Sequence, residues 1–233
     1  LSRRHRVTLF EREADFGGHV HTVEVPDGPD AGTPIDTGFI VMNDRTYPLF
    51  SSMLRALGVE RVDSDMSFGF HDRESGIAYC GTGWRGLFAQ PANIMRPTYW
   101  QMIRGVLRFF ERGRASLNDP SIETLTLNQW LRREAIPAVA AQRFVLPMGG
   151  AIWSTPAARF GDFPARTFLQ FFSNHGLLAV RDKPRWMTVR GGAHTYVRKL
   201  LAAFPGDARA ACPVESVSRD DDGVTVAARG LEP

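Results

Sequence analysis

Apolar side chains repeat at helical spacing over several stretches in the middle of the chain. Between Tyr47 and Gly58 they fall at positions i, i+3, i+4 and i+7, which predicts a helix that ends at the glycine. The same spacing from Tyr99 to Phe110 predicts a second helix that ends near Gly113. Helix-start patterns predict further helices at these places: Thr126 with Gln129, Pro137, Pro164, and the pair Gly191-Gly192.

Extended segments gather at the two ends of the chain, where apolar and polar residues alternate or form short β-branched runs. A hairpin is also predicted within residues 67–82. The other predicted strands cover residues 7–10, 19–25, 35–41, 213–218 and 224–228. Residues 45–185 are therefore expected to be mainly helical, between two strand-rich ends.

Charge and cysteine content exclude several classes of protein. The chain has 28 Lys and Arg against 25 Asp and Glu, a net charge of +3, and its arginines are spread along the sequence. Nucleic-acid binding is not expected, because it requires clustered basic residues. No apolar stretch approaches the roughly 20 residues of a membrane span. Cys80 and Cys212 lie far apart without metal-like spacing, which favours a reducing, cytoplasmic setting.

The pattern first indicates a chemical role at Glu11, the acid that directly follows the predicted strand 7–10. In a doubly wound nucleotide-binding fold, an acid that closes the second strand accepts hydrogen bonds from the ribose hydroxyls of adenosine. The Gly17-Gly18 turn that follows lets backbone pass close to a pyrophosphate, because no Cβ intrudes. Taken alone, the same residues also fit a surface strand followed by an ordinary glycine turn.

A second segment, residues 35–39 (Ile-Asp-Thr-Gly-Phe), comes after a loop and precedes the helix that leads into residues 57–59 (Leu-Gly-Val). The order of strand, acid, Gly-Gly, Asp-Thr-Gly, helix and Leu-Gly-Val resembles the FAD-dependent amine oxidase superfamily. This superfamily includes monoamine oxidases, phytoene desaturases and protoporphyrinogen oxidases. The resemblance implies an oxidoreductase that uses FAD as its cofactor.

Later motifs extend the resemblance over essentially the whole chain. Residues 186–192 (Trp-Met-Thr-Val-Arg-Gly-Gly) look like the family's return to the FAD domain. Residues 212–217, with the strand 224–226, look like the strand pair that passes the adenine. Residues 147–154 and 174–178 are similar to a bacterial branch described only as predicted NAD/FAD-binding proteins.

The resemblance implies an α/β fold in two interwoven parts. Residues 1–44 and 186–233 would form an incomplete FAD/NAD(P)-binding domain of the doubly wound, Rossmann-like type. Residues 45–185 would form a mostly helical substrate domain. The substrate is expected to pass a hydride to the flavin, with the protein supplying position and electrostatics.

The motifs also imply a set of FAD contacts that combines carboxylates, hydroxyls and glycines. The set is Glu11, Arg12, Gly17, Gly18, His19, Thr22, Asp36, Thr37, Gly38, Phe39 and Val214. Its three glycines are expected to lie close together and face the cofactor groove, and Val214 is expected to run antiparallel to 224–228. His19 stands where many relatives carry arginine, and its ring can donate a hydrogen bond to phosphate.

Two differences from the family concern the ends of the chain. The superfamily begins with a strand and a G-x-G-x-x-G turn about 20 residues before the acid. Here the ten residues before Glu11 contain no glycine. The sequence is therefore expected to begin after the phosphate-binding turn, to stop before a last FAD-binding segment, and to bind FAD poorly by itself.

Aromatic residues of the middle region could line a long apolar pocket or simply fill a core. They are Trp100, Phe109, Phe110, Trp153, Phe168, Phe171 and Phe172. If they line a pocket, a lipid or isoprenoid substrate is favoured over a small polar amine, because no buried acid stands out as a partner for an ammonium group. No catalytic acid or base is indicated, and Lys199 is expected to be solvated.

Other interpretations stay open. A lipid- or isoprenoid-binding protein without redox activity could keep the same fold, and an NAD-dependent dehydrogenase would use the same ribose acid. His19 and His21 have no third ligand nearby, so a metal site is not expected. The sequence leaves open the oligomeric state and a peripheral contact with a membrane.

Overall fold

The computed structural model describes residues 1–2, 4–180 and 184–230, and the chain divides into two compact units. Unit 1 consists of Leu1–Ser64 and Trp186–Pro233, and unit 2 of Asp65–Arg185. The second boundary between the units lies between residues 185 and 186. The first boundary falls after Ser64 and not after residue 44.

The first boundary lies later because residues 45–64 pack into unit 1. Strand β4 (Arg61–Asp63) pairs antiparallel with β7 (Met187–Val189). Helix α1 (Pro48–Ala56) places Leu54 in the apolar core of this unit. One helix and one strand that the pattern assigned to the middle region therefore belong to the strand-rich unit.

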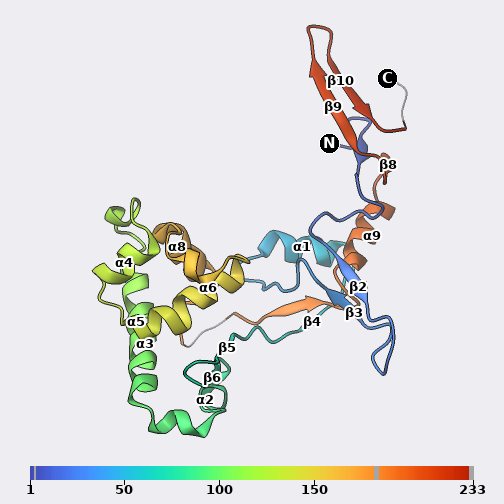
Figure 1. Ribbon diagram of the computed structural model, residues 1–233. Coiled ribbons are helices and arrows are strands. Elements are labelled where there is room, and N and C mark those ends of the chain that lie inside the picture. The colour runs from blue at the N-terminus through green and yellow to red at the C-terminus, as the bar shows by residue number, and fades with distance from the viewer. Residues whose placement is uncertain (3, 181–183, 231–233) are drawn as a thin grey trace. The chain divides into compact units, whose positions relative to one another are not determined.

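Unit 1 is built from pairs of short strands with two helices beside them (Figure 1). Its elements are β1 (Thr8–Phe10), β2 (Thr22–Glu24), β3 (Pro34–Asp36), α1, β4, β7, α9 (His194–Ala202), β8 (Asp207–Arg209), β9 (Val214–Arg219) and β10 (Val224–Ala228). Strands β1 and β8 are parallel, as a doubly wound sheet requires, and β2–β3, β4–β7 and β9–β10 are antiparallel. The strands predicted over 19–25 and 35–41 are present but only three residues long.

Unit 2 is mainly helical, as predicted, and contains the predicted hairpin β5–β6 (Figure 1). Its elements are β5 (Gly69–Asp72), β6 (Ile77–Cys80), α2 (Gly83–Leu87), η1 (Pro91–Met95), α3 (Pro97–Ser116), η2 (Pro120–Ile122), α4 (Leu127–Arg133), α5 (Ala138–Ala140), η3 (Ala141–Val145), α6 (Leu146–Ile152), α7 (Ala157–Phe160) and α8 (Ala165–Asn174). Among the helices of the described residues, none is both long and apolar enough to cross a membrane.

The helix-start prediction near residue 126 is confirmed, whereas one predicted helix end is wrong. Thr126 and Gln129 form a capping box, in which the Thr126 hydroxyl accepts the Gln129 N–H at 3.3 Å and Gln129 Oε1 accepts the Thr126 N–H at 2.8 Å. Helix α3 continues through Gly113 to Ser116. Gly113 has a packing role instead, because it is buried and a Cβ there would lie 3.1 Å from Leu178.

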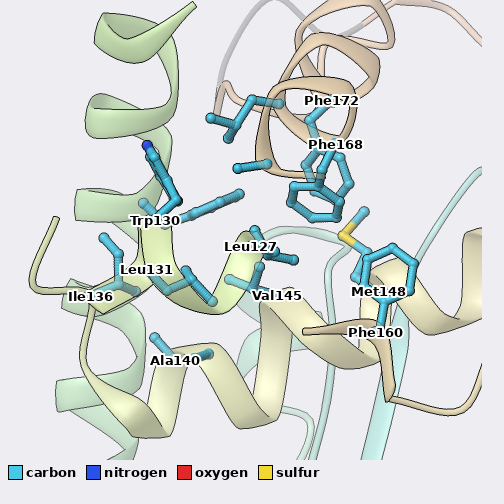
Figure 2. Packing of buried hydrophobic residues seen from close by; sticks show 14 of the residues in the cluster. Leu127, Trp130, Leu131, Ile136, Ala140, Val145, Met148, Phe160, Phe168 and Phe172 are labelled. Carbon is cyan, nitrogen blue, oxygen red and sulfur yellow. The ribbon is translucent and has the colours of Figure 1, made fainter. Parts of the chain in front are cut away.

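The core of unit 2 is formed by aromatic and aliphatic side chains from several helices. Figure 2 shows Trp130 of α4, Met148 of α6 and Phe168 of α8 directed into one shared interior. The ring centroids of Phe168 and Phe172 lie 4.1 Å apart, and both side chains are fully buried. Trp130 Nε1 donates to Ser116 Oγ at 3.1 Å, so the one polar atom of this ring is satisfied inside the core.

Most of the aromatic residues considered for a pocket pack on one another. Phe109 is fully buried, and its ring centroid lies 6.2 Å from that of Phe168 and 5.9 Å from that of Phe172. The rings of Trp153 and Phe171 lie 4.6 Å apart. The geometry of these five residues is that of a packed core.

Unit 1 has a smaller core, to which α1, β7 and α9 contribute. Its buried residues include Leu54 of α1, Val189 of β7 and Tyr196 of α9. The Phe50 ring meets the Tyr196 ring edge-on, with centroids 5.2 Å apart. Strand β9, by contrast, is exposed along its whole length.

Candidate cofactor-binding site

Glu11 directly follows β1, and hydrogen bonds to a segment far later in the sequence hold its backbone on both sides. Its N–H donates to the carbonyl of Arg209 at 2.8 Å, and its carbonyl accepts the N–H of Cys212 at 2.8 Å. The pairing of β1 with β8 sets up both bonds, because it places Phe10 opposite Arg209. The strand predicted before Glu11 therefore does end at this acid, at a fixed place in unit 1.

The carboxylate of Glu11 is half-buried and keeps capacity to accept hydrogen bonds. Oε1 accepts the N–H of Glu13 at 2.9 Å, whereas Oε2 accepts none from the described part of the chain. Arg12 is exposed, and its Nε donates to Glu13 Oε1 at 2.9 Å. The charge of Arg12 is thus already paired, while one oxygen of Glu11 remains available to a ligand.

Val214 is brought next to this acid by the residues just before β9. The N–H of Ala211 donates to the Glu13 carbonyl at 2.8 Å, and Cys212 is bonded to Glu11 as described above. Val214 begins β9 and pairs with Ala228 of the antiparallel strand β10. The predicted antiparallel hairpin is confirmed, and Glu11 and Val214 lie near each other although they come from opposite ends of the sequence.

The Gly17-Gly18 turn has a backbone that only glycine adopts readily. Their φ angles are +143° and +59°, and the Val20 N–H closes the turn on the Gly17 carbonyl at 3.0 Å. A Cβ at Gly17 would lie 2.8 Å from the Val20 carbonyl oxygen and 3.7 Å from Val197 of α9. A Cβ at Gly18 would meet nothing within 4 Å, so the turn is open on that side.

Gly38 packs directly against the residue that follows this turn. A Cβ at Gly38 would lie 1.8 Å from the carbonyl oxygen of His19, which is a severe steric clash, so the position requires glycine. The Phe39 N–H also donates to the His19 carbonyl at 3.3 Å. The structure therefore places Gly38 beside the Gly17-Gly18 turn, as expected, and leaves the His19 side chain exposed.

Thr22 and Asp36 meet at the N-terminus of α9. Both carboxylate oxygens of Asp36 accept the Ala193 N–H, at 2.9 and 3.0 Å. The Thr22 hydroxyl donates to Asp36 Oδ1 at 2.5 Å and accepts the His194 N–H at 3.1 Å. The pairing of β2 with β3 places Thr22 opposite Asp36, so the strand pair presents a ready-made cap to the helix.

Electrostatics around this cap extend to Tyr196, one turn into α9. Burial raises the pKa of the Tyr196 phenol, and the negative charge of Asp36 raises it further. The ring of Tyr196 lies in the core of unit 1. The Asp36 carboxylate therefore has a positive helix end on one side and a neutral phenol on the other.

The side chains of Thr37 and Phe39 are also engaged within the protein. The Thr37 hydroxyl lies 2.7 Å from His21 Nδ1 and donates to the His21 carbonyl at 3.1 Å. The Phe39 ring packs edge-on against Phe50 at 5.2 Å and against Tyr47 at 6.1 Å. A cofactor contact from residues 37–39 would therefore come from their backbone.

The predicted residues thus fall into two groups within unit 1. The first group lies beside β1 and β8 and consists of Glu11, Arg12 and Val214. The second lies around β2, β3 and the start of α9 and consists of Gly17, Gly18, His19, Thr22, Asp36, Thr37, Gly38 and Phe39. No group of three or more potential metal-ligating side chains occurs among the residues that the structure describes.

A sequence profile of the family described as flavin containing amine oxidoreductase matches residues 1–231. The chain belongs to this family. The match confirms the predicted superfamily and its flavin cofactor, and it covers both groups of residues in unit 1 as well as the whole of unit 2.

Several solved structures share the fold of this chain. Putrescine oxidase bound to putrescine is 20% identical, with a TM-score of 0.65 over 95% of this chain and 49% of that chain. A CLA-producing fatty acid isomerase from P. acnes is 15% identical, with a TM-score of 0.63 over 96% of this chain and 50% of that chain. Cyclohexylamine oxidase from Brevibacterium oxydans IH-35A is 18% identical, with a TM-score of 0.59 over 95% and 49%.

These likenesses confirm the predicted α/β fold class of this chain. The chain spans about half the length of these solved structures. No curated protein sequence matches it.

The cap on α9 is the feature of this site that the sequence motifs did not reveal. Asp36 and Thr22 were predicted as cofactor contacts, whereas the structure shows their oxygens bonded to Ala193 and His194. A clue was present in the sequence, because Ala193 stands at the N-cap position and has no side-chain acceptor. A helix that begins this way needs an acceptor from another part of the chain.

Proposed function

We propose that this chain is part of a flavoenzyme that moves a hydride from an apolar small molecule, a lipid or an isoprenoid, to FAD. The observation that carries the proposal is the family match over residues 1–231. The position of Glu11 directly after a strand of the parallel β1–β8 pair supports it.

Two features of unit 1 fit a dinucleotide cofactor. The Gly18 turn has open space where any other residue would carry a Cβ, so a ligand can approach its backbone. The Glu11 carboxylate keeps an oxygen that accepts nothing from the described residues. Thr22 and Asp36 fit a direct contact less well, because their oxygens hold the start of α9.

When bound, the flavin supplies the hydride acceptor of the reaction. The chain's own residues bind and orient it. Glu11 would accept hydrogen bonds from ribose hydroxyls, and the Gly17-Gly18 turn would let backbone N–H groups come close to a phosphate. Asp36 and Thr22 support the site indirectly, because they fix α9 against β2 and β3. We assign no residue of this chain to proton transfer.

An apolar substrate is supported by the charge distribution. Among the described residues, the buried polar side chains are Asn43, Ser51, Asn93 and Ser116, and no Asp or Glu is buried. An ammonium group taken out of water needs a buried acceptor or counter-charge. The fold also occurs in a fatty acid isomerase, whereas two other structures with it are oxidases of putrescine and cyclohexylamine.

A binding assay followed by anaerobic reduction tests the proposal. The protein is purified in full length and examined for the yellow absorbance of oxidised flavin. It is then mixed without oxygen with a long-chain fatty acid, an isoprenoid hydrocarbon or an aliphatic amine. We expect a bleached flavin with an apolar compound. If only the amine bleached the flavin, the proposal of an apolar substrate would be overturned.

Two rival functions give different results in the same assay. A non-catalytic lipid- or isoprenoid-binding protein would bind the apolar compound without any change in flavin absorbance. An NAD-dependent dehydrogenase would lack flavin and bind a nicotinamide nucleotide, since the ribose acid serves both cofactors. Either result would contradict the proposed hydride transfer to flavin.

Substitution of Glu11 tests its role in holding the cofactor. Glu11→Gln removes the charge of the proposed ribose acceptor, and each lost charged hydrogen bond should weaken flavin binding by about 1.5–3 kcal/mol. Glu13→Gln is the matched control, because Glu13 is exposed and its carboxylate binds Arg12. Flavin retention after dialysis is the measurement. If both variants retained flavin equally, Glu11 would not be a contact of the cofactor.

A further inference from the structure

One stretch of unit 2 carries positive charge without any acid. Between Glu74 and Glu111 the sequence contains four arginines and neither Asp nor Glu. This stretch forms β6, α2, η1 and most of α3, and Figure 1 shows α2 near one end of α3 within the unit. Because no acid offsets its four arginines, this stretch has a local net charge of +4, although basic residues are no denser here than elsewhere in the chain.

The same stretch exposes large apolar side chains. Met95 is 83% exposed, Trp84 71% and Ile94 50%. Single exposed apolar residues are normal on a protein surface, but a contiguous group marks a surface that contacts something apolar. The question is whether these three side chains belong to one surface.

Two ring contacts and one hydrogen bond to the backbone connect the segments that carry these three side chains. The rings of Trp84 and Phe88 stack with centroids 5.9 Å apart, and Phe88 lies 5.5 Å from Trp100. Trp100 Nε1 donates to the carbonyl of Ile94 at 2.9 Å, and Met95 follows Ile94 in η1. The exposed residues therefore lie around a common aromatic base.

Arginines border this surface. Arg85 follows Trp84 in α2 and is exposed, and Arg104 is exposed with its Nε donating to the Trp100 carbonyl at 3.3 Å. Farther along α3, Leu107 is 48% exposed between Arg104 and Arg108. A shallow depression of about 370 Å³ follows on this side of α3, with Glu111 and Arg112 at its far end.

We propose that this surface, the patch of Trp84, Ile94 and Met95 with Arg85 and Arg104, docks on an anionic phospholipid bilayer. Tryptophan prefers the boundary between water and hydrocarbon, and isoleucine and methionine gain free energy when they enter the acyl region. Arginine side chains beside them are attracted by phosphate and by the negative surface potential. Residues 75–110 themselves contribute no acid that would oppose this approach.

Docking would bring unit 2 to the place where lipids and isoprenoids are found. The inference does not depend on flavin chemistry, because vesicle binding is measured without turnover. The two proposals can therefore fail separately.

Vesicle co-sedimentation of the purified full-length protein tests the docking. The vesicles contain phosphatidylcholine alone or phosphatidylcholine mixed with phosphatidylglycerol. We expect binding to the anionic vesicles that weakens as salt is raised, because salt screens surface charge. Equal binding to both kinds of vesicle, or binding to neither, would overturn the proposal. The second result is expected if another segment or a second copy covers the patch.

The apolar part of the patch is tested by Met95→Ser and Trp84→Ser. Each should lower the partition coefficient on anionic vesicles more than about tenfold, because a large side chain no longer enters the bilayer. Leu49→Ser, on α1, is the matched control, since Leu49 is 85% exposed. Met95 makes the test robust to misfolding, because its side chain is mostly in water. Wild-type binding by both patch variants would contradict the proposal.

The charged part is tested by Arg85→Gln and Arg104→Gln. Each should lower the partition coefficient about fivefold on anionic vesicles. Arg132→Gln, at an exposed position of α4, is the matched control. A similar loss in the control would show a general effect of net charge and would overturn the assignment to this patch.

Discussion

The two units of this chain are stabilised in different ways. In unit 2, helices α3, α4, α6 and α8 share one core, where Phe109, Trp130 and Phe168 are fully buried. In unit 1, short paired strands leave apolar side chains in water, such as Ile35 at 47% and Val217 at 64% exposed. Its elements are joined in large part by hydrogen bonds between distant segments.

This difference indicates where each unit is sensitive to substitution. Unit 2 should lose most stability when an aromatic ring of its core is removed, because close-packed interiors relax only partly around a cavity. Unit 1 should lose most stability when a polar joint is broken, meaning a side chain that is hydrogen-bonded to the backbone of a distant segment, because a buried N–H is then left without an acceptor. The predictions below test this contrast from the largest expected effect to the smallest.

The largest effect is expected for Phe168→Ala in unit 2. The Phe168 ring contacts Phe172 at 4.1 Å and Phe160 at 5.7 Å between centroids, and it has no exposed surface. Its removal should destabilise unit 2 by about 3–5 kcal/mol. Denaturant unfolding followed by tryptophan fluorescence measures this, since Trp130 lies in the same core.

The control for this prediction is Leu107→Ala on α3, where the side chain is 48% exposed. It should change the free energy of unfolding by less than about 0.5 kcal/mol. If Phe168→Ala cost no more than this control, the aromatic set would not form a packed core. A pocket in unit 2 would then again be an option.

An intermediate effect is expected for Asp36→Ala in unit 1. The substitution leaves the Ala193 N–H without its acceptor and releases the Thr22 hydroxyl. The expected cost is about 1–3 kcal/mol, and the amides of α9 should exchange faster with solvent deuterium. Flavin retention should fall as well, because α9 is held against β2 and β3 through this residue.

Asp27→Ala is the control for this joint, because Asp27 is exposed in the loop between β2 and β3. Its α9 amides should exchange as in the wild type. If Asp36→Ala weakened flavin binding but left exchange in α9 unchanged, Asp36 would contact the cofactor directly. The sequence-based assignment would then be correct in place of the capping role.

Features with a local cause were predictable from the sequence. The capping box at Thr126 and Gln129 and the hairpin within 67–82 each depend on residues only a few positions apart. Helix α1 ends at Ala56, and Gly58 adopts a φ of +59°, as its position after the apolar repeat predicts. These elements follow from periodicity and backbone preference alone.

Features that depend on distant pairing were not predictable in the same way. Strand β8 has only three residues, Asp-Ala-Arg, which show no apolar alternation, and it is defined by its parallel pairing with β1. The cap of α9 by Asp36 likewise joins segments far apart in the sequence. Gly113 looked like a helix end, because the sequence does not show that Leu178 packs over it.

The smallest effect is expected for Lys199→Met, which tests a second polar joint of unit 1. The sequence pattern predicts that Lys199 is solvated, and the residue is indeed exposed. Its Nζ nevertheless donates to the carbonyls of Leu57 at 3.0 Å and Gly58 at 2.6 Å. These carbonyls follow the C-terminus of α1, where a positive charge is favourable. Methionine keeps most of the apolar stem and removes the charge, so the cost should be about 0.3–1 kcal/mol.

Hydrogen–deuterium exchange of the amides at the C-terminal end of α1 tests this polar joint most directly. The Val59 N–H donates to the Leu54 carbonyl at 2.9 Å, and this bond should open more often once the Lys199 ammonium no longer holds the neighbouring carbonyls. Arg198→Met is the matched control, because it removes a positive charge from an exposed position of the same helix. Equal exchange at Val59 in the two variants would show that only net charge matters. A selective effect of Lys199→Met would show that unit 1 relies on a polar joint even where a side chain is in contact with water.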